Sequence, residues 1–152
     1  MASLLFMLQR GAAELYLRRM EQLSEAVAEQ DAIAIAWTEF MRVQWLGFVE
    51  RDAWGAHEKI LVTQFQFERA GAGGIFAFVR VFVAVTDMLL GRFDRAEEEF
   101  KRILATTPAG SPDAMHSQFC LAFILLEQGR IDEASAVAAA LVQEAEARGE
   151  ML

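Results

Sequence analysis

Apolar residues recur at every third or fourth position in the last part of the chain. After Gly129 they fall at Ile131, Ala134, Ala138, Leu141, Val142 and Ala145. Steps of three and four place side chains on one face of an α-helix. Asp132 and Glu133 would stand in the first turn of that helix, where the positive end of its dipole favours acidic groups. The pattern therefore predicts a helix that starts just after Gly129.

The same pattern occurs 38 residues earlier, because GRFDRAEEEF begins at Gly91 and GRIDEASAVA begins at Gly129. The apolar positions of the earlier stretch are Phe93, Ala96, Phe100, Ile103 and Leu104. Glycine at each start suits the left-handed conformation that commonly ends a preceding helix. Each stretch therefore predicts a helix end, a tight turn and a new helix.

A more apolar segment precedes each of these stretches. In the second, Ser111 is a suitable N-cap and Pro112 a suitable first helical residue. In the first, residues 75–90 read IFAFVRVFVAVTDMLL, whose β-branched residues favour a strand on propensity alone. Because the matching segment carries helical start signals, we predict a helix over residues 75–90 as well.

A weaker copy of the pattern stands still earlier, in ERDAWGAHEKI. Its corresponding residues are Arg51, Ala53, Ala56 and Ile60. The marker alanines Ala56, Ala96 and Ala134 are separated by 40 and 38 residues. A further helix is expected over residues 12–28. We therefore predict one helical-repeat domain over residues 1–152, with repeat-like units near 32–70, 75–108 and 111–148.

The first unit is incomplete, with only Ser3–Gln9 before a break at Gly11. Stacked helix pairs need a cover at each end of the array. Two interpretations stay open: the chain is a piece of a longer protein, or its exposed end pairs with another copy.

The turn-to-helix signature resembles that of the tetratricopeptide repeat. It is carried by Gly91, Phe93, Ala96, Phe100, Ile103 and Pro108, and again by Gly129, Ile131, Ala134, Ala138 and Leu141. The spacing exceeds the standard ~34 residues, and such stretched repeats are similar to the helical arrays of large bacterial regulators, including the maltose-regulator-like transcription activators. The resemblance implies an all-α fold of about six to seven helices, with antiparallel pairs stacked as a right-handed superhelix.

The resemblance also implies a concave face lined by the first helix of each unit. Its residues would be Met41, Trp45, Phe48, Phe78, Val81, Val85, Met88, His116, Phe119 and Phe123. Two interpretations of this apolar set stay open. The residues form core, or they line a groove that binds a helix or an extended peptide of a partner or of an identical subunit, as a homodimer would.

Charge and composition narrow the classes of partner. The net charge is −8 and the pI about 4.8, and a nucleic-acid module would usually carry a basic stripe. Residues 75–90 are too short for a membrane span of ~20 residues and contain Arg80 and Asp87, each of which is expected to pair with a group on another helix. The single cysteine, Cys120, excludes an intrachain disulfide. We therefore predict a soluble cytoplasmic protein that contacts neither nucleic acid nor membrane.

No catalytic, cofactor or metal constellation emerges from the polar residues. In HEKIL, Leu61 replaces the second histidine of a zinc-protease motif, so His57 is interpreted as a solvated histidine. Asp113 and His116 form only one of the two pairs that a di-iron bundle needs. Glu97 and Glu99 are expected on an exposed face, and Cys120 is expected to be a buried, inert thiol. The GAGG segment, residues 71–74, is interpreted as a linker.

The leading hypothesis is therefore a non-enzymatic interaction or scaffold module, such as the regulatory segment of a bacterial transcription regulator. The alternative is a domain that encloses a small apolar effector. Its pocket would be lined by Phe65, Phe67, Phe76, Phe78 and Phe82.

Overall fold

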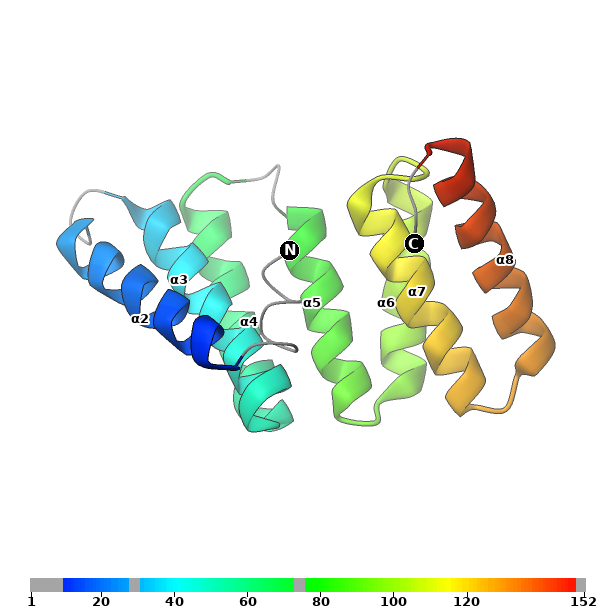
Figure 1. Ribbon diagram of the computed structural model, residues 1–152, viewed down its shortest axis with the longest axis horizontal. Coiled ribbons are helices and arrows are strands. Elements are labelled where there is room, and N and C mark those ends of the chain that lie inside the picture. Colours follow the sequence, from blue (N-terminus) through cyan, green and yellow to red (C-terminus); the bar gives the residue numbers. More distant parts are fainter. Residues whose placement is uncertain (1–9, 28–30, 73–75, 150–152) are drawn as a thin grey trace. The chain divides into compact units, whose positions relative to one another are not determined.

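The described residues of a computed structural model, 10–27, 31–72 and 76–149, form seven α-helices and no strand (Figure 1). This confirms the predicted all-α fold of about six to seven helices, while the stacking into a superhelix stays a prediction. The α-helices are α2 (Arg10–Val27), α3 (Ala32–Gln44), α4 (Ala53–Arg69), α5 (Phe76–Leu89), α6 (Phe93–Thr106), α7 (Pro112–Glu127) and α8 (Ile131–Ala147). A π-helical segment, η1 (Trp45–Glu50), follows α3 directly.

The start of α7 shows why the local sequence specifies a helix. The Ser111 side chain accepts a hydrogen bond from the Ala114 amide at 3.3 Å, and Pro112 is the first helical residue. These features satisfy an otherwise orphaned donor and preset the backbone angle. The apolar segment before Gly91 is helix α5, so the helical prediction is confirmed and the β-branched propensity is overridden. Residues Ser3–Gln9, Gly73 and Gly74 lie outside the described residues.

Three helices begin two residues after a residue whose backbone has the left-handed conformation, with a positive φ angle. Arg51, Gly91 and Gly129 have φ angles of 59°, 72° and 74°, and α4, α6 and α8 start at Ala53, Phe93 and Ile131. The last two turns also share a bond pattern, in which the amide of Arg92 or Arg130 reaches the carbonyl five residues earlier, at 2.9 Å. The corresponding positions in the sequence therefore have corresponding backbone geometry.

Replacing Arg51 with glycine is expected to stabilise the protein by about 0.5–1 kcal/mol. An L-residue at positive φ is strained by contact between Cβ and the backbone, and glycine lacks the Cβ. Urea unfolding followed by circular dichroism would measure the change. Arg51→Ala removes the same long side chain but keeps the Cβ, so no such gain is expected. An equal gain in both variants would show that the side chain, not the backbone, is responsible.

Clustering of backbone contacts divides the chain into two compact units, with the boundary between Val79 and Arg80 in α5. In the N-terminal unit, Trp37 lies at the centre of an aromatic cluster. Its ring centroid is 5.6 Å from that of Phe40, 5.3 Å from Phe67 and 5.9 Å from Phe78. The predicted single domain over residues 1–152 stays a prediction.

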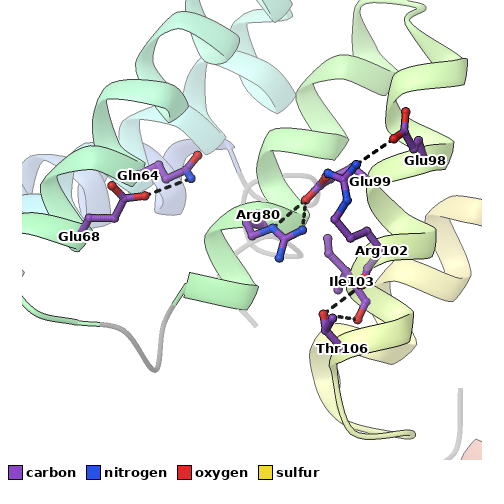
Figure 2. Close-up of polar contacts among 8 residues, drawn as sticks. All are labelled: Gln64, Glu68, Arg80, Glu98, Glu99, Arg102, Ile103 and Thr106. Carbon is purple, nitrogen blue, oxygen red and sulfur yellow. Dashed lines mark hydrogen bonds and ion pairs between the residues drawn. The ribbon is translucent and has the colours of Figure 1, made fainter.

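Both charges of the apolar helix α5 are paired in the C-terminal unit, Arg80 with another helix as predicted and Asp87 mainly with the turn that precedes α6. Arg80 donates to Glu99 of α6 with its Nε 2.7 Å from the carboxylate, where Arg102 also binds (Figure 2). Asp87 is buried and accepts from Arg92, just before α6, at 3.0 Å. Both charges keep an ion partner, which offsets the cost of removing them from water.

Candidate functional site

An open apolar groove lies between α7 and α8 in the C-terminal unit. It has a volume of about 400 Å³. Its lining includes Phe119, Phe123 and Leu126 from α7 and Ile131, Ala138 and Leu141 from α8. The side chains around it offer apolar contact area and almost no hydrogen-bonding groups, so it suits an apolar ligand surface.

The groove follows from the way α7 packs. The buried residues of α7 are Ala114, Ser117, Cys120, Leu121, Ile124 and Leu125. Phe119 comes two residues after Ser117, which places it about 200° further round the helix. Phe119 and Phe123 remain 63% and 43% exposed. Helix α7 therefore has an apolar face on both sides, and only one of them is covered in the structure.

Small residues of α8 make the surface concave. Of its predicted apolar face, Ala134, Leu141 and Ala145 are buried, whereas Ile131, Ala138 and Val142 are exposed. Ser135 and Ala138 lie on the α8 side of the groove, where their short side chains leave space. In the sequence, the groove residues of α8 are indicated by an apolar stripe that is wider than one buried face requires. The spacing of the apolar residues does not say which part of that stripe a neighbouring helix covers.

The structure distributes the ten predicted groove residues unevenly. Phe119 and Phe123 line the α7–α8 groove. Met41, Val81 and Val85 are buried, so they contribute to the core and cannot line an exposed face. The others, Trp45, Phe48, Phe78, Met88 and His116, are half-buried. The predicted set draws on both units, and a continuous concave groove stays a prediction.

Two of these residues lie in a structure that the periodicity did not reveal. Trp45 and Phe48 belong to the π-helical segment η1, and the Trp45 indole donates to Glu50 at 2.8 Å. A π-helical turn holds an extra residue and therefore shifts the side chains that follow it. The directions of the Trp45 and Phe48 side chains therefore cannot be obtained by extending the α-helical spacing of α3.

Of the five phenylalanines expected around an effector pocket, the structure describes the side chains of four, and each of these has its own surroundings. Phe65 is exposed and Phe67 is buried, because two residues along α4 point about 200° apart. Phe78 packs on Trp37 and Phe40, and the described part of the chain does not include the Phe76 side chain. Phe82 contacts His116 instead, edge to face, with ring centroids 5.6 Å apart.

Glu97 and Glu99 do not lie on an exposed face, contrary to expectation. Glu97 is buried, and its carboxylate accepts from Lys101 at 2.6 Å and from Arg130 at 2.8 Å. Glu99 is half-buried between Arg80 and Arg102. Arg80 lies on α5 and Arg130 just before α8, so these two side chains reach the glutamates of α6 from outside that helix. Lys101 and Arg102 reach them from the next turn of α6. These contacts keep both glutamates from full exposure.

Replacing Glu97 with glutamine is expected to cost about 1–2 kcal/mol at pH 7, because charged hydrogen bonds to a buried group are lost. The hydrogen bond from Lys101, and then that from Arg130, lower the pKa of Glu97 against the opposing effect of burial. A lowered folded-state pKa stabilises the protein above the unfolded value of about 4.3, and this contribution is lost as the pH falls further.

Urea unfolding at pH 7, 5 and 3 would therefore show a difference between wild type and Glu97→Gln that shrinks at the lowest pH. Glu98→Gln is the matched control, because the Glu98 side chain is 74% exposed in its pair with Arg102 and such pairs contribute little. A difference that persists unchanged at pH 3 would contradict the assigned ion pairs.

Burial removes the histidines and the cysteine partly or wholly from solvent. His57 is buried rather than solvated, with 8% of its surface exposed. Burial lowers the pKa of His116, against the opposing charge of Asp113. Burial also raises the pKa of the Cys120 thiol to about 12. Cys120 is thus a buried thiol that stays protonated at neutral pH, as expected.

Within the described residues, no three His, Cys, Asp or Glu side chains gather closely enough to hold a metal ion. No helix in this part of the chain has both the length and the apolar character required to cross a bilayer. Comparison of the chain with known protein families, with curated proteins and with solved structures finds no match.

Proposed function

We propose that this chain is a non-catalytic interaction module that binds a helix or an extended peptide in the α7–α8 groove. The segment bound would come from a partner protein or from a second copy of the chain. The observation that carries the proposal is the exposure of Phe119 and Phe123 beside an apolar groove of about 400 Å³. Exposed apolar patches usually mark interaction sites, and grooves between helices commonly receive an apolar helix face.

A stacked, tetratricopeptide-like array is the architecture proposed for this module. Three similar turn geometries, at Arg51, Gly91 and Gly129, support it. The stretched spacing of the marker alanines supports a role as a regulatory segment of a bacterial transcription regulator, acting in the cytoplasm. The acidic net charge of −8 makes a protein partner more suitable than direct contact with nucleic acid.

Phe123→Glu is expected to weaken binding in the groove by about tenfold or more, because loss of a central aromatic anchor commonly costs about 2 kcal/mol. Phe65→Glu is the matched control, since Phe65 is an exposed phenylalanine of α4 outside the groove. Circular dichroism of both variants would confirm that they fold.

Two measurements cover the two sources of the bound segment. Light scattering over a concentration series would detect self-association that Phe123→Glu removes and Phe65→Glu retains. A displayed library of amphipathic helical peptides would detect binding with the same dependence on the two variants. A chain that stays monomeric and enriches no groove-dependent peptide would contradict the proposal.

A further inference from the structure

The two helix pairs of the C-terminal unit, α5–α6 and α7–α8, correspond residue by residue at an offset of 38 positions. This offset relates the groove to a face of the first pair. Phe119, Phe123, Leu126, Ile131, Ala138 and Leu141 correspond to Val81, Val85, Met88, Phe93, Phe100 and Ile103. All members of both sets are apolar, so apolar residues with the same spacing occur in both helix pairs.

The first of these two surfaces is covered. Helix α7 packs against α6, and His116 of α7 contacts Phe82 of α5, so α7 reaches both helices of the first pair. Val81, Val85 and Phe100 are buried. Their counterparts in the second pair are exposed. The surface of the first pair is thus buried and has α7 packed beside it, whereas the corresponding surface of the second pair is open.

Polar contacts fix the direction in which α7 lies on the first pair. Gln128, which follows the last residue of α7, donates to Asp94 in the first turn of α6 at 3.4 Å. Arg130 reaches Glu97 from the same end at 2.8 Å. The C-terminal end of α7 therefore lies beside the N-terminal end of α6, and the two helices are antiparallel.

We infer that the α7–α8 groove binds an amphipathic helix of a partner protein in the position and direction that α7 takes on α5–α6. This inference rests on the function proposed above and names its ligand class. The bound helix runs antiparallel to α8, so its C-terminal end lies beside Asp132, the counterpart of Asp94. Asp132 is exposed there, whereas Glu133 is already paired with Arg130 at 2.6 Å. A basic residue in the last turn of the partner helix therefore complements Asp132.

The groove also specifies the apolar face of its ligand. The first pair has the fully buried Phe100, whereas the second pair has the exposed Ala138 at this position and Ser135 beside it in the groove. The missing phenyl ring leaves space for a large apolar side chain from the partner helix. Small residues towards the start of that helix, as at Ala114 and Ser117 in α7, let it approach closely.

The probe for this inference is a synthetic α7 peptide, residues 111–128 with Cys120→Ser, a fluorescent label and two added C-terminal lysines. Fluorescence anisotropy with the full chain is expected to show saturable binding. Ala138→Trp fills the groove and is expected to weaken that binding at least tenfold. Ala140→Trp is the matched control, because Ala140 is exposed about 200° away on α8.

Disulfide trapping tests the direction. The chain carries Asp132→Cys with Cys120→Ser, and the peptide carries either Gln128→Cys or Ser111→Cys, activated as a mixed disulfide. Preferential trapping of the Gln128→Cys peptide is expected. Preferential trapping of the Ser111→Cys peptide, or equal trapping of both, would overturn the inferred direction while leaving the groove a binding site.

Two further outcomes would overturn the inference. Peptide binding that survives Ala138→Trp would show that the probe displaces the chain's own α7 or binds elsewhere. Absence of peptide binding would reject an α7-like helix as the ligand, and self-association or library peptides sensitive to Phe123→Glu would show that the proposed function nevertheless holds. Self-association through the groove would make a second copy the occupant in place of a partner helix.

Discussion

Replacing Phe100 with alanine is expected to lower the free energy of unfolding by about 3–5 kcal/mol, the range observed for a fully buried phenylalanine. The Phe100 side chain is 0% exposed. It lies on the buried face of α6, one turn after Ala96 and one turn before Ile103. Removing the ring would leave a cavity, and Ala96 and Ile103 could not close it without a shift of the helix backbone.

Urea unfolding monitored by circular dichroism would measure this loss, with the midpoint falling and the slope unchanged. Phe119→Ala is the control, because the Phe119 ring is 63% exposed and its removal opens no cavity. The two substitutions delete the same atoms from adjacent helices of one unit. Equal effects would show that Phe100 does not occupy the core position assigned to it.

The helix boundaries were largely predictable because their signals are local. Glycines that precede α6 and α8, and the Ser111–Pro112 start of α7, act within one turn of the residues that they control. The helical prediction for α5 needed a comparison with a second segment, since the propensity of its valines favoured a strand. Local chemistry and internal repetition together were sufficient for the fold class.

The candidate site was less predictable because coverage is a tertiary property. The apolar stripe of α8 looks continuous in sequence, yet Leu141 is buried and Val142 beside it is exposed. Periodicity reports which side chains share a face and cannot report whether a neighbouring helix covers it. The buried carboxylate of Glu97 was missed for the same reason, since its partner Arg130 is 33 residues away.

The marker alanines connect the sequence signature to close packing. Ala56 and Ala96 are fully buried, and Ala134 is nearly so. Each is the fourth residue of its helix, directly after the turn. At this point a larger side chain would push the helix away from its neighbours. The small side chain of alanine at these positions is thus explained by the limited space after the turn.

Ala96→Leu is therefore expected to destabilise the protein by about 1–3 kcal/mol, although leucine has a similar helix propensity and is more apolar. The added atoms have no space at a position that is 0% exposed, so the backbone or its neighbours must shift. Ala136→Leu is the control: Ala136 is exposed on α8, and there the same change should be nearly neutral.

Thermal and urea unfolding of both variants would separate overpacking from a loss of helicity, because circular dichroism of the folded state should stay the same. The expected ranking places Ala96→Leu well below Ala136→Leu in stability. If Ala96→Leu were instead as stable as the wild type, space would exist beside α6 that the structure does not show. The turn-to-alanine signature would then have no packing cause, and the correspondence between α6 and α8 would lose its physical basis.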